Sequence, residues 1–358
     1  MMDEFPAPAH GGNIYQASKE FEIPVENWID LSAGISTRPY PFSPVSQNAY
    51  RQLPYCDPVL IQIAKKYYQT IDVLPVAGSQ QVIQLLPDIL KQGNLWVPKV
   101  GYQEYAYQWT KKGRKVFSYP SFFKEETVDV ITRAIEQGAV DHLLVINPNN
   151  PTGLILPTPI LLKWSKQLQA RDGMLIIDEA FMDIHPEESI FKLGKSLPDN
   201  LIVLRSFGKF FGLAGIRIGF VSAAADFLKI IQSCLGPWCV NGVAQDIAIE
   251  ALNDSQWHNR MRKKIQADNS KTLELFTPIL AQYCGGLFAQ KGLFITWKLE
   301  VDEGKTLYSR LAELGVLVRL ISYSNQYCLI RIGNAYPLTT DSAGSLPDRL
   351  SALIKNSP

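Results

Sequence analysis

The stretch Ser206-Phe-Gly-Lys209-Phe-Phe-Gly-Leu-Ala-Gly-Ile-Arg217-Ile-Gly219 decides how the rest of the chain is interpreted. Lys209 carries a primary amine three residues after the hydroxyl of Ser206 and eight residues before the guanidinium of Arg217. Its apolar neighbours favour a buried amine over a solvated lysine in a glycine-rich turn, and a buried lysine deprotonates readily enough to attack an aldehyde. Ser206 and Arg217 supply a hydroxyl and a bidentate guanidinium for a phosphate group.

Asp178 is the second informative residue, because it closes the apolar run 174–177. In an open α/β sheet, ligands bind beyond the carboxyl ends of the strands. A buried carboxylate there can hold a pyridine nitrogen protonated, so that the ring accepts electrons from a substrate. The alternative is a strand-end aspartate that binds only the amides of the next turn. Lys209, 31 residues later, favours the first interpretation. An acid, an amine and a phosphate-binding set together predict pyridoxal 5'-phosphate as the cofactor.

Three short segments add candidate contacts to this cofactor. Gly78-Ser79-Gln80 lies between a predicted strand and a predicted helix, where backbone amides bind a phosphate, although Ser79 is equally typical of a helix N-cap. Asn150 belongs to a turn fixed by two prolines and is expected to donate to the phenolic oxygen, although such turns are also common without a ligand. Tyr102 is a candidate to stack on the ring or, alternatively, a core aromatic residue.

The composition restricts the class of protein. Of 358 residues, 46% are hydrophobic, and the formal net charge of +1 argues against nonspecific attraction to nucleic acid or to a membrane. No apolar run reaches the roughly 18–20 residues that cross a bilayer, and the acidic amino terminus does not resemble a signal peptide. The five cysteines are scattered without a Cys-x-x-Cys pair, which disfavours a disulfide framework and a metal site. We therefore expect a soluble cytoplasmic protein.

Short apolar runs alternate with helical segments, the pattern of a mostly parallel sheet flanked by helices. The predicted strands of this sheet are 95–97, 115–117, 142–146, 174–177, 201–204 and 218–221, and the predicted helices are 58–68, 80–90, 125–137, 158–170 and 243–252. A long amphipathic helix begins near residue 256, and the runs 294–297, 316–319 and 327–331 predict strands of a second sheet. We expect an α/β fold with a large domain, 46–252, and a smaller α+β domain made of 1–45 and 253–358. The first 45 residues carry little periodicity.

The order of the motifs resembles that of fold type I pyridoxal-phosphate enzymes. These motifs are Gly-Ser-Gln at 78–80, Gly-Tyr-x-Glu-Tyr at 101–105, Asn-Asn-Pro-Thr-Gly at 149–153, Asp-Glu-Ala-Phe at 178–181, Ser-x-x-Lys at 206–209 and Gly-Ile-Arg-x-Gly at 215–219. The resemblance spans nearly the whole chain. It looks like the branch that contains histidinol-phosphate aminotransferases and the L-threonine-O-3-phosphate decarboxylases of cobalamin biosynthesis. It implies a homodimer in which Lys209 binds the cofactor covalently and Asp178 binds the ring nitrogen.

Three stretches favour the decarboxylases. His10-Gly11-Gly12-Asn13 is similar to their opening motif, 28–35 to their next segment, and 237–241 to a third. By the same resemblance, Arg331 binds the α-carboxylate of the substrate and Arg319 binds its phosphate. The remaining substrate contacts that it implies are His10, Gly11, Gly12, Asn13 and Gly34.

Other interpretations of these residues stay open. The glycine pair can be a chance feature of a tail, and both arginines can lie at a surface strand edge. An aminotransferase acting on histidinol phosphate would bind the cofactor with the same residues. A regulator or scaffold with this fold would catalyse no reaction.

The chain departs from the family pattern at three positions. Gly208 stands where the decarboxylases have a hydroxyl residue, which removes one phosphate donor. Phe181 replaces the tyrosine of many aminotransferases, as it does in the decarboxylases, and would lie beside the cofactor. Tyr55, in Pro54-Tyr55-Cys-Asp57-Pro58, matches a tyrosine that reaches the phosphate in a partner subunit, although its register is shifted.

Overall fold

The computed structural model describes residues 7–194, 198–335, 339–340 and 344–355. The chain forms two compact units. Residues 7–8, 39–150 and 154–257 form the first unit, and residues 9–38, 151–153 and the chain from residue 258 onward form the second. Among the described residues, no helix is both long and apolar enough to cross a membrane.

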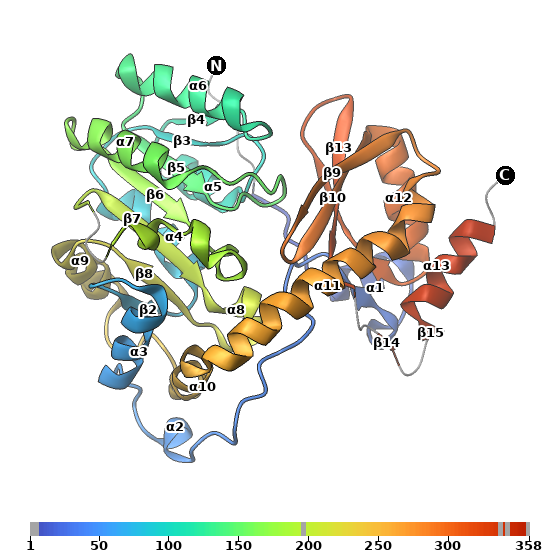
Figure 1. Ribbon diagram of the computed structural model, residues 1–358, viewed down its shortest axis with the longest axis horizontal. Helices are drawn as coiled ribbons and strands as arrows, with labels where there is room; N and C mark the ends of the chain where they lie inside the picture. Colours follow the sequence, from blue (N-terminus) through green and yellow to red (C-terminus); the bar gives the residue numbers. More distant parts are fainter. Residues whose placement is uncertain (1–6, 195–197, 336–338, 341–343, 356–358) are drawn as a thin grey trace. The chain divides into compact units, whose positions relative to one another are not determined.

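A seven-stranded sheet forms the centre of the first unit (Figure 1). Its strands, in spatial order, are β2 (Leu74–Val76), β8 (Gly219–Ser222), β7 (Leu201–Ser206), β6 (Met174–Asp178), β5 (His142–Ile146), β3 (Leu95–Pro98) and β4 (Val116–Tyr119). The five strands from β7 to β4 are parallel, and β8 is antiparallel to both β7 and β2. The sheet is therefore mostly parallel, as the sequence pattern predicts.

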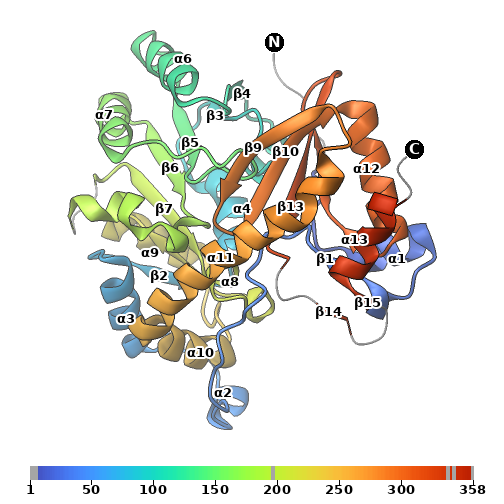
Figure 2. The ribbon, with the colours of Figure 1, turned by 45° about the vertical axis from the view of Figure 1, so that its right-hand side comes forward.

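Helices cover both faces of this sheet (Figures 1 and 2). The helices of the unit are α2 (Asn48–Arg51), α3 (Pro58–Tyr68), α4 (Ser79–Ile89), α5 (Glu104–Lys111), α6 (Lys124–Glu136), α7 (Thr158–Gln169), α8 (Phe207–Phe210), α9 (Ala225–Leu235) and α10 (Gly242–Asn253), with short 3-10 turns η2 (Met182–Ile184), η3 (Pro186–Glu188), η4 (Ile190–Leu193) and η5 (Ala214–Ile216). Helices α4, α5 and α9 share one buried cluster with the strands, and α6 and α7 pack together on the other face. Because β5 is buried along its whole length, it reads as a continuous apolar run.

An antiparallel sheet forms the centre of the second unit, in the order β12 (Arg319–Ser322), β13 (Tyr327–Gly333), β10 (Phe294–Glu300) and β9 (Gly285–Lys291). The other elements are α1 (Ile14–Phe21), η1 (Val25–Asn27), β1 (Ile29–Asp30), α11 (Ser255–Leu280), α12 (Val301–Glu313), β11 (Val316–Leu317), β14 (Thr339–Thr340), β15 (Gly344–Ser345) and α13 (Leu346–Lys355). Apolar residues of α11, α12 and α13 pack with β10 and β13 in one core. Figure 2 shows the course of these helices and strands. This is the smaller α+β arrangement that the sequence predicts.

Two expectations for the second unit are wrong in detail. Residues 316–319 form two short strands instead of one, because Val316 and Leu317 pair in parallel with β1 whereas Arg319 pairs with Arg331 of β13. The amino-terminal region is also less irregular than its composition suggests. It contains α1, whose buried Ala17 packs with Trp28, Ala312 and Leu317.

The boundary between the units differs from the predicted one at residues 39–45. These residues belong to the first unit instead of the second, and that unit continues to Trp257. The Tyr40 amide donates to the carbonyl of Phe211 at 2.9 Å, and the Ser43 amide donates to Glu250 at 3.0 Å. Because these hydrogen bonds join an irregular segment to distant residues, no local periodicity in the sequence predicts them.

Candidate active site

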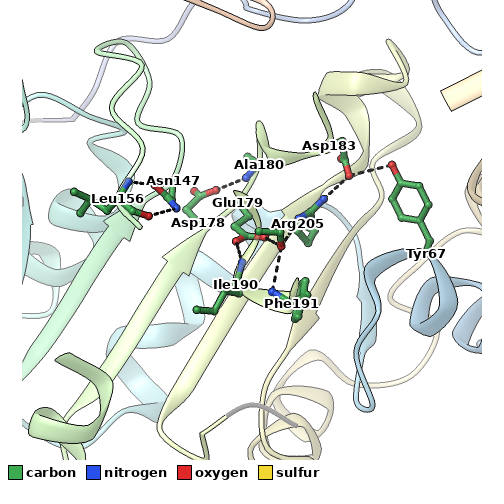
Figure 3. A network of polar contacts seen from close by, with 11 residues as sticks. Tyr67, Asn147, Leu156, Asp178, Glu179, Ala180, Asp183, Ile190, Phe191 and Arg205 are labelled. Atoms are coloured by element: carbon green, nitrogen blue, oxygen red, sulfur yellow. Dashed lines mark hydrogen bonds and ion pairs between the residues drawn. The ribbon is translucent and has the colours of Figure 1, made fainter. Parts of the chain in front are cut away.

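Asp178 ends β6 and is 4% exposed. Its Oδ2 accepts a hydrogen bond from the Tyr105 hydroxyl at 2.8 Å, and its Oδ1 accepts one from the Ala180 amide at 2.9 Å, the second of which is drawn in Figure 3. Burial raises the pKa of Asp178, and the Ala180 amide, the Tyr105 hydroxyl and the charge of Lys209 act in the opposite direction. A protonated ring nitrogen is the kind of partner that stabilises such a buried carboxylate.

Lys209 lies in the short helix α8, directly after the end of β7. Its Nζ is 5.6 Å from the ring centroid of Phe181, and its charge acts on Asp178. Phe207 and Phe211 are fully buried and stack at 4.2 Å, so the segment that carries the half-buried Lys209 is apolar, as the sequence predicts. Ser206 is the N-cap residue of the same helix and is half-buried.

The start of α4 and the guanidinium of Arg217 lie side by side. Gly78, and not Ser79, is the N-cap residue of α4, and its φ of 83° is the left-handed conformation that glycine adopts without strain. A Cβ on Gly78 would lie 2.8 Å from Nη2 of Arg217, and a Cβ on Gly219 would lie 2.9 Å from the Ser79 amide nitrogen. Both glycines therefore leave room where a helix amino terminus and an arginine converge, and this combination favours a phosphate.

The hydroxyl of Tyr102 forms a hydrogen bond with the first turn of α4. The Tyr102 hydroxyl donates to Gln80 Oε1 at 2.9 Å, and Gln80 Nε2 donates to Glu104 at 2.8 Å. Burial raises the pKa of Tyr102, as do Glu104 and Asp178, whereas Arg217 lowers it. The ring therefore lies within electrostatic reach of both the acid and the phosphate-binding arginine.

The donor set of the first unit fits pyridoxal 5'-phosphate. A buried acid at Asp178 suits the ring nitrogen, and an amine at Lys209 within the field of that acid suits the aldehyde. The close approach of Arg217 to Gly78, and of Gly219 to the Ser79 amide, suits the phosphate. Acid, amine and anion cradle all come from the carboxyl-terminal side of β6, β7 and the turn before α4, which the sequence predicts for this class of site.

A buried ionic network lies beside these residues and was not predicted (Figure 3). Arg205 is 4% exposed, and its guanidinium binds Glu179 at 2.6 Å and also Asp183. Although burial opposes it, these two carboxylates raise the pKa of Arg205. Glu179 also accepts hydrogen bonds from the Ser189 hydroxyl at 2.6 Å and the Ile190 amide at 2.8 Å. Since Glu179 follows Asp178 and Arg205 precedes Ser206, the network fixes the strand ends that carry the site.

Two arginines face each other in the second unit. Arg319 of β12 and Arg331 of β13 are directly paired in the antiparallel register, where side chains lie on the same face. Burial and the charge of Arg319 together lower the pKa of Arg331 to about 10, although Asp30 acts in the opposite direction. Two like charges at paired positions are destabilising by themselves. A ligand with two anionic groups removes that repulsion.

Residues 9–13, here called the amino-terminal strap, lie against these arginines. Nη2 of Arg319 donates to the carbonyl of Ala9, and the Gly12 amide donates to Ser32 Oγ at 2.7 Å. His10 between them is exposed. Asn13 caps α1, because its Oδ1 accepts from the Gln16 amide at 3.1 Å. The structure therefore brings the strap and both predicted arginines into one region. Gly34 lies in the same part of the chain with a left-handed φ of 59°.

Tyr55 and Asn150 are two further residues for which the sequence predicts a contact with the cofactor. Tyr55 is 73% exposed, and its ring meets the edge of Trp238 at 6.0 Å. Asn150 is half-buried at the end of the segment 39–150 of the first unit, whereas its neighbour Asn149 is buried and donates to the carbonyl of Val100 at 2.8 Å. Their proposed contacts with a cofactor stay predictions.

Gly208 has a packing reason that the sequence did not reveal. A Cβ there would lie 2.6 Å from Cα of Ala214, and backbone cannot move as a flexible side chain can. We expect Gly208→Ser, which restores the hydroxyl of the family pattern, to lower the free energy of unfolding by about 1–3 kcal/mol. Gly215→Ser is the matched control, because a Cβ at Gly215 meets open space. Equal urea denaturation midpoints for the two variants would contradict this expectation.

Comparison with known proteins places the chain in a family. The chain is 39% identical over 266 residues to a threonine-phosphate decarboxylase of Pseudomonas aeruginosa, covering 74% of this chain and 77% of that one. It is 36% identical over 355 residues to a threonine-phosphate decarboxylase of a Sinorhizobium species, covering 96% and 98%. The fold is similar to that of a histidinol-phosphate aminotransferase from Sinorhizobium meliloti in complex with pyridoxal 5'-phosphate, with a TM-score of 0.72, 18% identity and 98% of each chain covered. Residues 47–334 match the family model for aminotransferase class I and II, and the chain belongs to that family.

Proposed function

We propose that this protein is a pyridoxal-phosphate-dependent decarboxylase that converts L-threonine O-3-phosphate to (R)-1-amino-2-propanol O-2-phosphate and CO2, a step of cobalamin biosynthesis. The observation that carries the proposal is the directly paired Arg319 and Arg331, which suit a substrate with two anionic groups. The two threonine-phosphate decarboxylases described above support it, because their similarity extends over most of the chain.

The first unit would hold the cofactor. Lys209 would bind it through Nζ, Asp178 through its ring nitrogen, and Gly78, Ser79, Gln80, Ser206 and Arg217 through its phosphate, with Tyr102, Phe181 and Asn150 beside the ring. When bound, pyridoxal phosphate supplies a conjugated ring that accepts the electron pair left at Cα. Asp178 keeps the ring nitrogen protonated, because its own charge is stabilised by that proton. Lys209 would donate a proton from Nζ to Cα, where this proton takes the place of the carboxylate that leaves as CO2.

The second unit would hold the substrate anions. Arg331 binds the α-carboxylate, and Arg319 binds the phosphate together with His10 and Gly11 of the strap. Which bond at Cα breaks depends on how the substrate is oriented, and two planar guanidinium groups that hold two anions fix that orientation. Histidinol phosphate has a phosphate but no carboxylate, so it would leave one of the paired arginines without an anion.

The decisive assay offers both substrates to the purified protein. CO2 is measured with threonine phosphate, and glutamate release is measured with histidinol phosphate and 2-oxoglutarate. We expect CO2 from the first mixture and little glutamate from the second. Glutamate without CO2 would instead establish the aminotransferase, and the absence of both products would favour a regulator or scaffold.

Arg319→Ala should reduce kcat/KM for threonine phosphate by roughly a hundredfold or more. Removing a charge-assisted contact that is buried with the substrate costs about 2–5 kcal/mol, and each 1.4 kcal/mol is tenfold. The measurement is the decarboxylation rate as a function of substrate concentration. Arg310→Ala is the control, because that guanidinium binds the Tyr283 hydroxyl at 3.0 Å and the carbonyl of Leu353 at 3.4 Å, and neither partner belongs to β12 or β13. Equal kcat/KM values for Arg319→Ala and wild type would remove Arg319 from the site.

The proposal includes a cytoplasmic homodimer. The first unit exposes the large apolar side chains of Tyr50, Leu53, Tyr55 and Trp238, which a second copy of the chain can cover. All five cysteines are free, as a reducing compartment requires. Light scattering during size-exclusion chromatography measures the mass directly, and a monomer at assay concentration would exclude the dimer.

A further inference from the structure

Ser32 joins the strap to the carboxylate-binding arginine within the second unit. The residue is 1% exposed. Its Oγ accepts a hydrogen bond from the Gly12 amide at 2.7 Å, and its carbonyl oxygen accepts one from Nη2 of Arg331. The side chain of one residue therefore holds the strap, and its backbone holds the arginine.

Asp30 fixes the orientation of the Ser32 hydroxyl. Asp30 Oδ1 accepts hydrogen bonds from both the amide and the hydroxyl of Ser32, at 2.8 and 2.6 Å. Because the hydroxyl proton points at Asp30, the oxygen presents its lone pairs to the Gly12 amide. Strand pairing holds the support in place, since the Leu31 amide donates to Leu317 at 2.8 Å and the Gly333 amide donates to Leu31 at 2.7 Å.

The strap is attached at both of its ends. Arg319 binds the carbonyl of Ala9, and Ser32 binds the amide of Gly12. Between them Gly11 packs directly on Ser32, where a Cβ would lie 2.3 Å from the carbonyl oxygen. A strap held at two points keeps its shape before the ligand arrives, and preorganised groups bind a ligand with a smaller loss of entropy.

We propose that Ser32 is a positioning residue that sets the selectivity for the substrate phosphate by holding the amino-terminal strap at a fixed place beside Arg319 and Arg331. The proposal rests on the proposed function, in which the strap and Arg319 bind that phosphate. Loss of the hydroxyl frees the Gly12 end of the strap but leaves the contact with Arg331, which is made by the backbone. Phosphate binding should therefore weaken while carboxylate binding persists.

The test compares Ser32→Ala with wild type on phosphorylated and unphosphorylated substrate. For Ser32→Ala we expect KM for threonine phosphate to rise roughly tenfold with kcat within about twofold, since a lost buried hydrogen bond has about this effect on an equilibrium. Rates with unphosphorylated threonine should not change. The dissociation constant of inorganic phosphate, measured by calorimetry on the cofactor-loaded enzyme, should rise by the same factor. Amide hydrogen exchange in residues 9–13 should become faster.

Matched variants separate positioning from general damage to the unit. Ser36→Ala removes a second buried hydroxyl of the same segment, one that forms hydrogen bonds of 3.3 Å with the backbone of Arg38, and should leave all four measurements unchanged. Ser32→Thr keeps the hydroxyl and should restore phosphate binding. If Ser32→Ala does not fold, Asp30→Asn, which weakens the acceptor that orients Ser32, should give a smaller shift in the same direction.

Several results would overturn the assignment of Ser32. They are an equal change of KM for both substrates, an unchanged dissociation constant for inorganic phosphate, or a wild type that does not bind inorganic phosphate. The phosphate and exchange measurements do not depend on turnover. A wild type that binds phosphate through the strap but releases no CO2 would therefore disprove the proposed reaction while leaving the role of Ser32 intact.

Discussion

Lys209→Ala is expected to abolish covalent retention of pyridoxal phosphate and to lower CO2 release by about 10⁴-fold, since the variant loses both the attachment point and a positioned proton donor. The wild-type protein should be yellow, and reduction with borohydride should leave the cofactor on the peptide that contains Lys209. The alanine variant should show no such adduct by mass spectrometry.

Lys229→Ala is the matched control for this experiment. Lys229 lies on the same unit, on the exposed side of α9, where it pairs with Asp226 at 2.8 Å. Its substitution should change neither colour nor rate. A wild-type protein that stays colourless after addition of pyridoxal phosphate would contradict the whole interpretation of the first unit.

Asp178→Asn is expected to retain the cofactor but to lose about 10²–10³-fold in kcat. A neutral amide has the same shape as the carboxylate. Its oxygen can accept from the Ala180 amide and its NH2 group can donate to the Tyr105 hydroxyl, but it cannot hold a ring nitrogen protonated. The loss should therefore appear in kcat more than in cofactor affinity. Asp226→Asn, at an exposed site on α9, should have no effect. Activity within a few-fold of wild type would show that Asp178 is only a turn residue.

Although Asp178→Asn lowers kcat, it should stabilise the cofactor-free protein at neutral pH. Burial raises the pKa of Asp178 above its unfolded value, so the folded state binds the proton more tightly than the unfolded state. Stability is then lowered at neutral pH, where the group is charged, and this cost is relieved as the pH falls through the folded pKa. The melting temperature of Asp178→Asn should exceed that of wild type at neutral pH, and the difference should shrink in acid. A difference that grows on acidification would contradict the direction of the pKa shift.

The sequence predicted the parts of this molecule that depend on local patterns. Helix 58–68 agrees with α3, because apolar periodicity follows Pro58, and strand 142–146 agrees with β5, because a continuous apolar run marks it. Lys209 and Asp178 were identified because their chemistry is rare in apolar surroundings. Arg319 and Arg331 came from resemblance alone, and only the strand register shows that they are paired.

Other features depend on contacts between distant residues, which no local pattern contains. Tyr105 donates a hydrogen bond to the carboxylate of Asp178, yet in the sequence it is one aromatic residue among many. Ser32 acquires its role from partners near residues 12 and 331. A signal was available for Arg205, since an arginine that ends an apolar strand needs a buried partner, and Glu179 follows another such strand. Residues 316–319 form two strands instead of one because the first half pairs with β1 and the second half pairs with β13.

The opposed placement of Asp178 and Glu179 constrains how this chain can change. Adjacent residues of a strand point to opposite sides, so one carboxylate meets Tyr105 while the next meets Arg205. Inserting or deleting a single residue in β6 would turn each acid to the opposite side, so that Glu179 faces the side of Tyr105 and Asp178 faces the side of the arginine. A substitution within β6 is therefore tolerated if the new side chain is similar in size and polarity. A change in the length of the strand is not tolerated. Length variation among related chains should accordingly be confined to the loops on either side of this strand.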